Sequence, residues 1–344
     1  MKNSSFTKIF NKLHQIFDAP VLIDKMPIIL LVIALICGMA IKSNYLIRVL
    51  DTAMIYVLLS LGLNVVLGYT GLLHMGFAGY LAIGAYMWGL LASPQHNLHL
   101  SFWVVFPLAG LTTGLIGYLV SLPIKDLRGD YFAVVTIGLG EIVRILANNL
   151  GVTNGALGIM QIDPIDLGFY KFTSDRDYFY LLIVVIALVV IIMKRLENSY
   201  IGKAWMAIRE DETAAKAMGI NTRAMKLLAC FIGAIPAGLA GVIFSASMAY
   251  VNPVSFKSSE SVAIIAMVMV GGRGNVMGVV MGALLLAILP EPLRGTPLDG
   301  ARVLIYGLLL VLIAVNRPQG MFPRKYRNIS LKKLGKETKS GEIK

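Results

Sequence analysis

Residues 226–250 read KLLACFIGAIPAGLAGVIFSASMAY, and no charged side chain follows Lys226 in this stretch. A helix needs roughly 20 mainly apolar residues to cross the hydrocarbon core of a bilayer, so the stretch predicts a membrane-spanning helix. The composition of the chain agrees, because 57% of its 344 residues are hydrophobic and only 15% are charged. Soluble domains usually carry about 25% charged residues.

The rest of the chain contains further apolar runs of similar character. They lie at about 27–41, 46–68, 72–92, 101–123, 131–150, 178–194, 260–271, 276–290 and 302–316. The runs at 260–271 and 276–290 are short and are separated by glycines, so they form either two complete helices or a broken, partly re-entrant pair. We expect an all-α polytopic membrane protein with about 8–10 transmembrane helices, and charge does not choose between eight and ten.

The basic residues orient this arrangement. The chain has 31 Lys and Arg residues against 19 Asp and Glu. With the N-terminus inside and alternating spans, 23 of the 31 fall on the cytoplasmic side, as the positive-inside rule requires. We therefore predict a multi-pass membrane protein with both termini in the cytoplasm. Because the basic residues lie in loops and tails between apolar runs, they are topology signals, and no nucleic-acid partner is expected.

Three regions follow from this pattern. Residues 1–25 form an N-terminal segment with apolar side chains at helical spacing, typical of a helix on the inner membrane surface, although a loosely ordered tail fits equally well. Residues 26–322 form the transmembrane domain. Residues 323–344 form a basic cytoplasmic tail, which is low in apolar residues towards its end.

Several chemistries lack their motifs. The chain has no G-x-x-x-x-G-K-[ST] loop for nucleotide phosphates. Its four histidines form no metal-ligand pattern, and His96 and His99 lie in a polar segment where we expect them to be solvated. No nucleophile, base and acid stand out together. We therefore predict no enzyme activity, no catalytic residue, no metal and no cofactor on this chain. Uphill transport would draw energy from another chain or from an ion gradient.

The loop at residues 198–226 is the most informative polar segment. Its composition favours a helix, and its apolar residues fall on one side at spacings of three and seven: Trp205, Ile208, Ala215 and Met218. Gly219 suits a helix stop, and Asn221 or Thr222 would cap the next helix. A protruding docking helix and a helix lying flat on the membrane explain the pattern equally well.

Two kinds of site lie within the apolar runs. Glu141 and Arg144 are three residues apart and share a helix face, so they can pair. They would either line a pathway for a zwitterionic solute or join helices as an internal ion pair. The helix breaks at Gly71 and Gly272 are candidates for backbone contact with a solute. Arg48 and Asp51 are expected to form an interfacial pair near an outer helix end.

Several motifs together resemble a known family. Glu212-Thr-Ala-Ala-Lys-Ala-Met-Gly219 resembles the E-A-A-x-x-x-G pattern of ABC importer permeases. Further matching segments occur in the family's order at 68–79, 127–144, 153–158, 270–278 and 316–320. Over roughly residues 45–325 the chain resembles the M-type subunit of the branched-chain amino-acid ABC permeases. It departs from the family around His74, where a small polar residue is more usual.

The resemblance implies a function and partners. The chain would be the permease subunit of an importer for a small amino acid, foremost leucine, isoleucine or valine, with urea as an alternative within the family. It implies a sister permease in a heterodimer, two cytoplasmic ATPase subunits that hydrolyse ATP, and a periplasmic or extracellular binding protein.

The residues expected to couple transport to the ATPases are Arg209, Glu210, Asp211, Glu212 and Gly219. An autonomous secondary transporter is the less favoured alternative. It would need an ion-coupling site within the membrane, and Glu141 is the one mid-span acid that the sequence offers.

Overall fold

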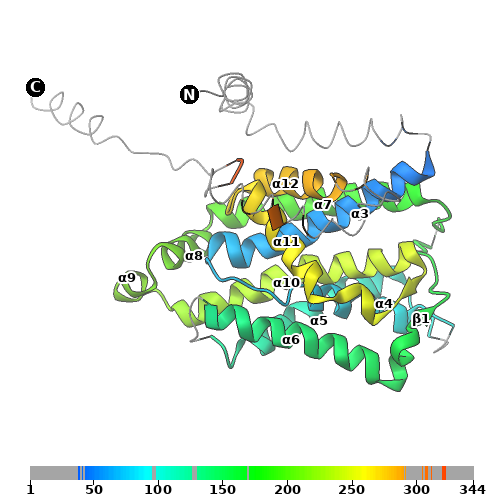
Figure 1. Cartoon of the computed structure of the whole chain (residues 1–344), viewed down its shortest axis with the longest axis horizontal. Helices are drawn as coiled ribbons and strands as arrows, with labels where there is room; N and C mark the ends of the chain where they lie inside the picture. The colour runs from blue at the N-terminus through cyan, green and yellow to red at the C-terminus, as the bar shows by residue number, and fades with distance from the viewer. Residues whose placement is uncertain are drawn as a thin grey trace, which may run out of the picture.

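A computed structural model describes residues 43–94, 98–125, 130–168 and 170–289. It also describes residues 38, 41, 291, 304, 307, 308, 311 and 320–322. Figure 1 shows long helices lying side by side along one direction, with very little strand. The predicted all-α polytopic fold is confirmed.

Within these residues, five helices are long and apolar enough to cross a membrane. They are α3 (Asn44–Leu63) continued by the π-helix η1 (Asn64–Tyr69), α5 (Phe102–Ser121), α6 (Asp130–Asn149), α7 (Asp175–Asn198) and α10 (Thr222–Met248). Shorter apolar helices are α4 (Ala78–Leu91), α11 (Ser258–Gly271) and α12 (Val276–Ile288). Each corresponds to one of the apolar runs predicted between residues 46 and 290.

The two outermost runs, 27–41 and 302–316, lie outside the described residues apart from single positions. The N-terminal segment 1–25 and the tail 323–344 lie outside them as well.

Helix α10 is the centre of the bundle, and small residues let its neighbours approach it. A Cβ atom built on Gly84 of α4 would lie 2.0 Å from the Gly238 carbonyl oxygen. One on Gly62 of α3 would lie 2.4 Å from the Gly233 carbonyl oxygen. Side chains are therefore excluded at these crossings, and packing between backbones holds the helices together, as is common in membrane bundles.

The chain passes back and forth between two ends. At one end lie α8 (Tyr200–Glu210) and α9 (Glu212–Ala217), and we call it the α9 end (Figure 1). At the other end, β1 (Ile159–Met160) pairs antiparallel with β2 (Tyr250–Val251), and we call it the β1 end. The short helices η2 (Gly151–Thr153), η3 (Gly155–Leu157) and η4 (Pro253–Phe256) adjoin these strands.

The expected pair between Arg48 and Asp51 is wrong. The Arg48 Nε atom lies 2.8 Å from the Asp175 carboxylate at the start of α7, and Asp51 is buried, with 5% of its surface exposed. The reason lies in the tertiary structure. Helix α7 brings a second carboxylate to the exposed side of α3, while Asp51 faces the bundle.

Candidate functional site

The loop at 198–226 forms two helices rather than the single helix expected. Helix α8 ends at Glu210, and Asp211 adopts an extended conformation with φ −155°. The Asp211 carboxylate accepts hydrogen bonds from the backbone N–H groups of Thr213 and Ala214, at 2.7 and 3.0 Å. Asp211 therefore caps the N-terminus of α9, a structural role that the prediction of ATPase contact did not foresee.

Helix α8 is fixed to the bundle. Trp205 is fully buried and stacks on Tyr69 of η1, with ring centroids 6.3 Å apart. Its Nε1–H group donates to the Met225 carbonyl oxygen at 2.7 Å. Ile208 is buried beside it. The apolar side of α8 therefore packs against the rest of the bundle.

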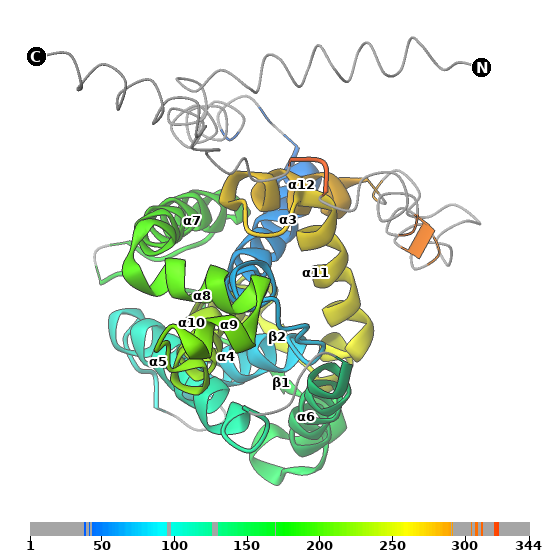
Figure 2. The same cartoon turned by 90° about the vertical axis from the view of Figure 1, so that its left-hand side faces the viewer.

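Helix α9 is the part that projects, as seen at the left of Figure 1 and from that end in Figure 2. Ala215 is buried, but Met218 is 82% exposed. The expectation that Met218 shares the buried side is wrong, because the break at Asp211 resets the helical phase. The sequence pattern had treated the loop as one continuous helix.

The end of α9 has the predicted stop. Gly219 has φ +83°, a left-handed conformation that favours glycine. Its N–H group donates to the Lys216 carbonyl oxygen at 3.0 Å, and that of Ile220 to the Ala215 carbonyl oxygen at 3.1 Å. This is the Schellman arrangement of a helix C-terminus. Asn221 then caps α10 through the N–H group of Ala224.

The charged residues of the loop reach different partners. Arg209 Nη1 donates to the Gly68 carbonyl oxygen at 2.5 Å. The Glu212 carboxylate lies 2.8 Å from Lys226 Nζ and accepts from the Thr222 hydroxyl at 3.3 Å. The side chain of Glu210 is 69% exposed. Two of the residues predicted to couple with ATPases thus contact the chain's own bundle.

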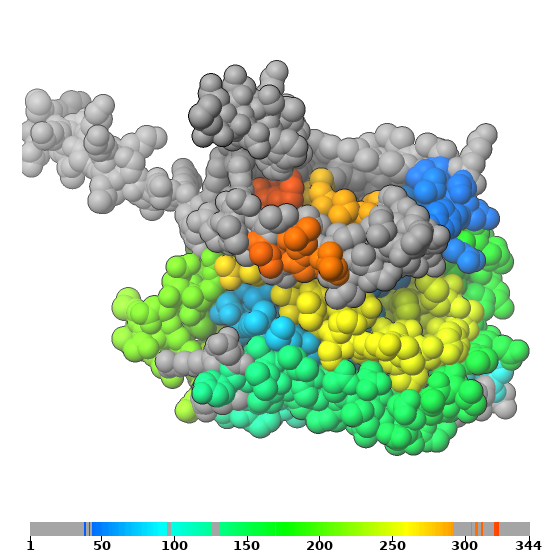
Figure 3. All heavy atoms as spheres, viewed as in Figure 1, coloured from blue at the N-terminus to red at the C-terminus, as the bar shows by residue number. Residues whose placement is uncertain are grey.

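The intramembrane pair forms as predicted. Arg144 Nε lies 2.6 Å from the Glu141 carboxylate, and the Ser258 hydroxyl at the start of α11 donates to the same carboxylate at 2.5 Å. The two side chains remain 29% and 31% exposed. Helix α6, which carries them, lies at the edge of the bundle beside α11 (Figures 2 and 3). The pair therefore ties α6 to α11 at a partly open face.

The helix breaks at Gly71 and Gly272 lie apart from the Glu141–Arg144 pair. Gly71 has φ +75°, and a Cβ atom there would lie 2.8 Å from the Cγ atom of Arg209 at the α9 end. Gly272 has φ +112° and lies against Gly320. Ser258 and Gly271 are the two ends of α11, which at ~1.5 Å per residue is about 20 Å long. The four residues predicted to line a pathway therefore fall into two groups, one near each end of α11.

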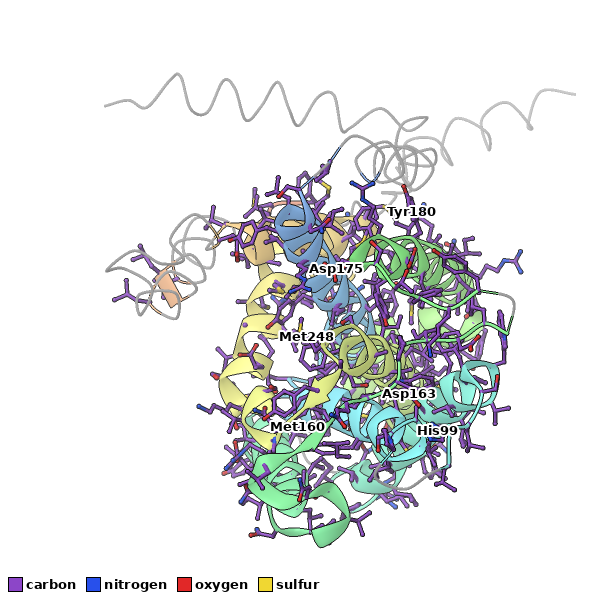
Figure 4. All side chains as sticks on the ribbon, turned by 90° about the vertical axis from the view of Figure 1, so that its right-hand side faces the viewer. His99, Met160, Asp163, Asp175, Tyr180 and Met248 are labelled. Atoms are coloured by element: carbon purple, nitrogen blue, oxygen red, sulfur yellow. The ribbon has the colours of Figure 1, made fainter. Side chains whose placement is uncertain are left out.

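One site was not foreseen from the sequence. At the β1 end a pocket of about 530 Å³ is lined by Trp88, His99, Asp163 and Lys171, among others. His99 Nδ1 lies 2.6 Å from the Asp163 carboxylate, and Figure 4 labels both residues. The many acidic residues of segment 151–177 were the available signal. Their partners depend on the pairing of distant loops.

Comparison with known proteins places the chain in a class. The family described as the branched-chain amino acid transport system permease component matches residues 45–314. The chain therefore belongs to this family, and it is a permease subunit of an ABC importer rather than an enzyme. No solved structure matches the chain.

Three of the relatives that match the chain carry the name LivM. The high-affinity branched-chain amino acid transport system permease protein LivM of Escherichia coli K12 is 38% identical, covering 92% of this chain and 79% of that protein. LivM of Salmonella typhimurium is 41% identical, covering 81% and 70%. The probable LivM of Methanocaldococcus jannaschii is 27% identical, covering 79% and 91%. The expected resemblance to the M-type permeases is confirmed.

Proposed function

We propose that this permease moves a branched-chain amino acid (leucine, isoleucine or valine) inward, and that ATPases on separate chains supply the energy. The names of the relatives support this class of solute. The observation that carries the coupling is α9, a short helix capped at both ends that projects from the bundle. Its base, α8, is fixed by Trp205.

The α9 end is the cytoplasmic end in this proposal. Lys203, Lys216 and Arg223 are on or next to α8 and α9, and positive charge favours the cytoplasm. Both termini then lie in the cytoplasm of a bacterial plasma membrane. Single cysteines at positions 171 and 257 should react with an impermeant reagent from outside, and those at 203 and 333 should not. Reaction at 203 from outside would contradict this topology.

The outer surface of α9 supplies the contact for an ATPase. Ala214, Ala217 and Met218 are exposed there, flanked by Lys216. An exposed methionine suits an apolar groove on a partner, because its unbranched side chain adapts to the surface it meets. The chain carries no nucleotide-binding motif of its own, so ATP would be bound and hydrolysed by the two ATPase subunits.

The face that bears Glu141 and Arg144 would meet the sister permease. A charged side chain at mid-bilayer costs roughly 2.5–3.5 kcal/mol on insertion scales and so avoids lipid. These two side chains are about one-third exposed on the isolated chain. Covering them with a second permease would remove them from lipid and place them beside a shared pathway.

The test is reconstitution of the permease pair and ATPases in liposomes with a binding protein and radiolabelled leucine. We expect uptake that requires ATP. Met218→Asp should lower substrate-stimulated ATP hydrolysis and uptake, while Lys203→Ala, at an exposed position on α8, should leave both unchanged. Accumulation of urea instead of leucine would reassign the substrate. Uphill transport by the permease without ATPases would overturn the proposal.

A further inference from the structure

The two helix breaks, Gly68–Gly71 at the end of η1 and Gly271–Gly274 at the end of α11, meet at the α9 end through Gly68 and Gly274. The Gly274 N–H group, in the turn between α11 and α12, donates to Asn64 Oδ1 of η1 at 2.9 Å, and the contact is buried. A Cβ atom on Gly68 would lie only 2.7 Å from the Gly274 nitrogen. The end of α3 and the α11–α12 turn are therefore in backbone contact, although they are far apart in the sequence.

Arg209 of α8 reaches into this junction. Its Nη1 atom donates to the Gly68 carbonyl oxygen at 2.5 Å. A Cβ atom on Gly274 would lie 3.0 Å from the same nitrogen, and one on Gly71 would lie 2.8 Å from Arg209 Cγ. The arginine stem thus passes Gly71, and the guanidinium group lies where the two breaks touch.

The chemistry of the junction explains why an arginine suits it. Gly68 is in the last turn of η1, where backbone carbonyls lack partners within the helix. A guanidinium group is always charged and offers several N–H donors in a planar fork. A hydrogen bond from a charged donor contributes more than a neutral one. Arg209 therefore stabilises a helix end that would otherwise be unsatisfied.

The same residue is joined to the projecting helix. Arg209 is in the last turn of α8, three residues before α9 begins. Trp205, one turn earlier, stacks on Tyr69 at the end of η1. A force applied to α9 therefore reaches the junction through a short and well-packed path. Withdrawal of Arg209 by one or two ångströms would break its contact with Gly68.

We propose that Arg209 is a positioning residue that clasps the cytoplasmic end of the permease closed, and that movement of α9 by the ATPases releases it. The inference rests on the proposed function and adds a gate to it. The clasp joins three elements: η1, the α11–α12 turn and α8. Opening it would separate α3 from α11, which flank the junction in the end-on view (Figure 2).

A cysteine reporter tests this in the complete reconstituted complex. Ser60 is fully buried in α3 and faces Met267 of α11. In a background with Cys37 and Cys230 replaced by alanine, Ser60→Cys gives a nearly isosteric thiol behind the clasp. We expect slow labelling by an impermeant maleimide from the α9 side, at a rate that changes when a non-hydrolysable ATP analogue is added.

Arg209→Ala should raise that labelling about tenfold, the effect of a barrier lowered by ~1.4 kcal/mol, and make it independent of nucleotide. Arg209→Lys should restore part of the wild-type behaviour, because lysine retains one charged donor. Lys203→Ala is the matched control, since this basic residue of α8 is exposed. A purely structural role would lower the amount of complex without abolishing the nucleotide response.

Asn64→Ala provides a second route to the same answer, because it removes the contact with Gly274 without altering α8. If Arg209→Ala fails to assemble, this variant decides. If the variants that assemble are labelled at the wild-type rate and still respond to nucleotide, the role of Arg209 as a clasp is wrong. ATP-driven leucine uptake by the wild type would still support the proposed function in that case. Absence of that uptake in the wild type would instead overturn the proposed function.

Discussion

Lys226, whose side chain is only 5% exposed, forms a 2.8 Å ion pair with Glu212, the first residue of α9. The pair joins α9 to the first turns of α10, across the Schellman stop and the Asn221 cap. Glu212 is 16% exposed, so water screens the pair only weakly. The acid of the E-A-A motif therefore sets the angle at which α9 leaves the bundle.

Charge reversal at Glu212 should uncouple transport. Glu212→Lys would place two ammonium groups side by side, and breaking a buried pair costs about 3–5 kcal/mol. We expect substrate-stimulated ATP hydrolysis and uptake to fall at least about tenfold at equal permease levels. The exchange Glu212→Lys with Lys226→Glu should recover part of the activity. Wild-type uptake in the single variant would show that the pair is dispensable.

Gly219 gives a prediction based on backbone conformation alone. A Cβ atom there would meet nothing within 4 Å, so the cost of a side chain arises from φ +83°. A left-handed residue with a side chain costs roughly 1–2 kcal/mol, and a β-branched one is the worst choice. Gly219→Val should impair coupling, and Gly219→Asn should be tolerated better.

Gly151 is the matched control for that comparison. It also has open space around it, but it lies in η2 and has no positive φ. Gly151→Val should retain uptake and ATP hydrolysis. Equal behaviour of the valine variants at 151 and 219 would contradict the conformational argument.

Leucine at either glycine break should abolish uptake while sparing membrane insertion. At Gly71 the side chain would push against Arg209, and at Gly272 the backbone has φ +112° close to Gly320. Both changes would distort the closed junction rather than the outer half of the bundle. Gly151→Leu is the control, because no atom lies within 4 Å of a Cβ atom there. Uptake and surface levels, measured together, separate lost transport from lost insertion.

Much of the fold follows from the sequence because lipid imposes a simple rule on it. An apolar run of sufficient length must be a helix, so the runs between residues 46 and 290 all correspond to helices. The stop at Gly219 was predictable too, since a left-handed helix end favours glycine. The order of the motifs identified the family before any geometry was known.

The partners of the polar residues could not be predicted from the sequence, because these partners lie on other helices and loops. Arg209 was expected at an ATPase contact, and its partner, Gly68, is separated from it by α4 to α7. Met218 is exposed because Asp211 ends α8 and caps α9, a break that the spacing of the apolar residues does not reveal. In both cases the local sequence pattern indicated a helix correctly. A tertiary contact of Arg209 and a helix break at Asp211 decided which partners the side chains meet.

Transport kinetics can distinguish the two roles considered for the Glu141–Arg144 pair, which are lining the solute pathway and joining α6 to α11. If the pair lines the pathway, Glu141→Gln should raise the KM for leucine several-fold while the amount of complex stays unchanged, because the carboxylate would meet the ammonium group of the solute. If the pair only ties α6 to α11, the same change should lower the amount of complex and leave KM unaltered. Ser258→Ala removes one hydrogen bond to the carboxylate and keeps its charge. We expect it to retain the wild-type KM, and a raised KM in this variant as well would show that the orientation of the carboxylate matters as much as its charge.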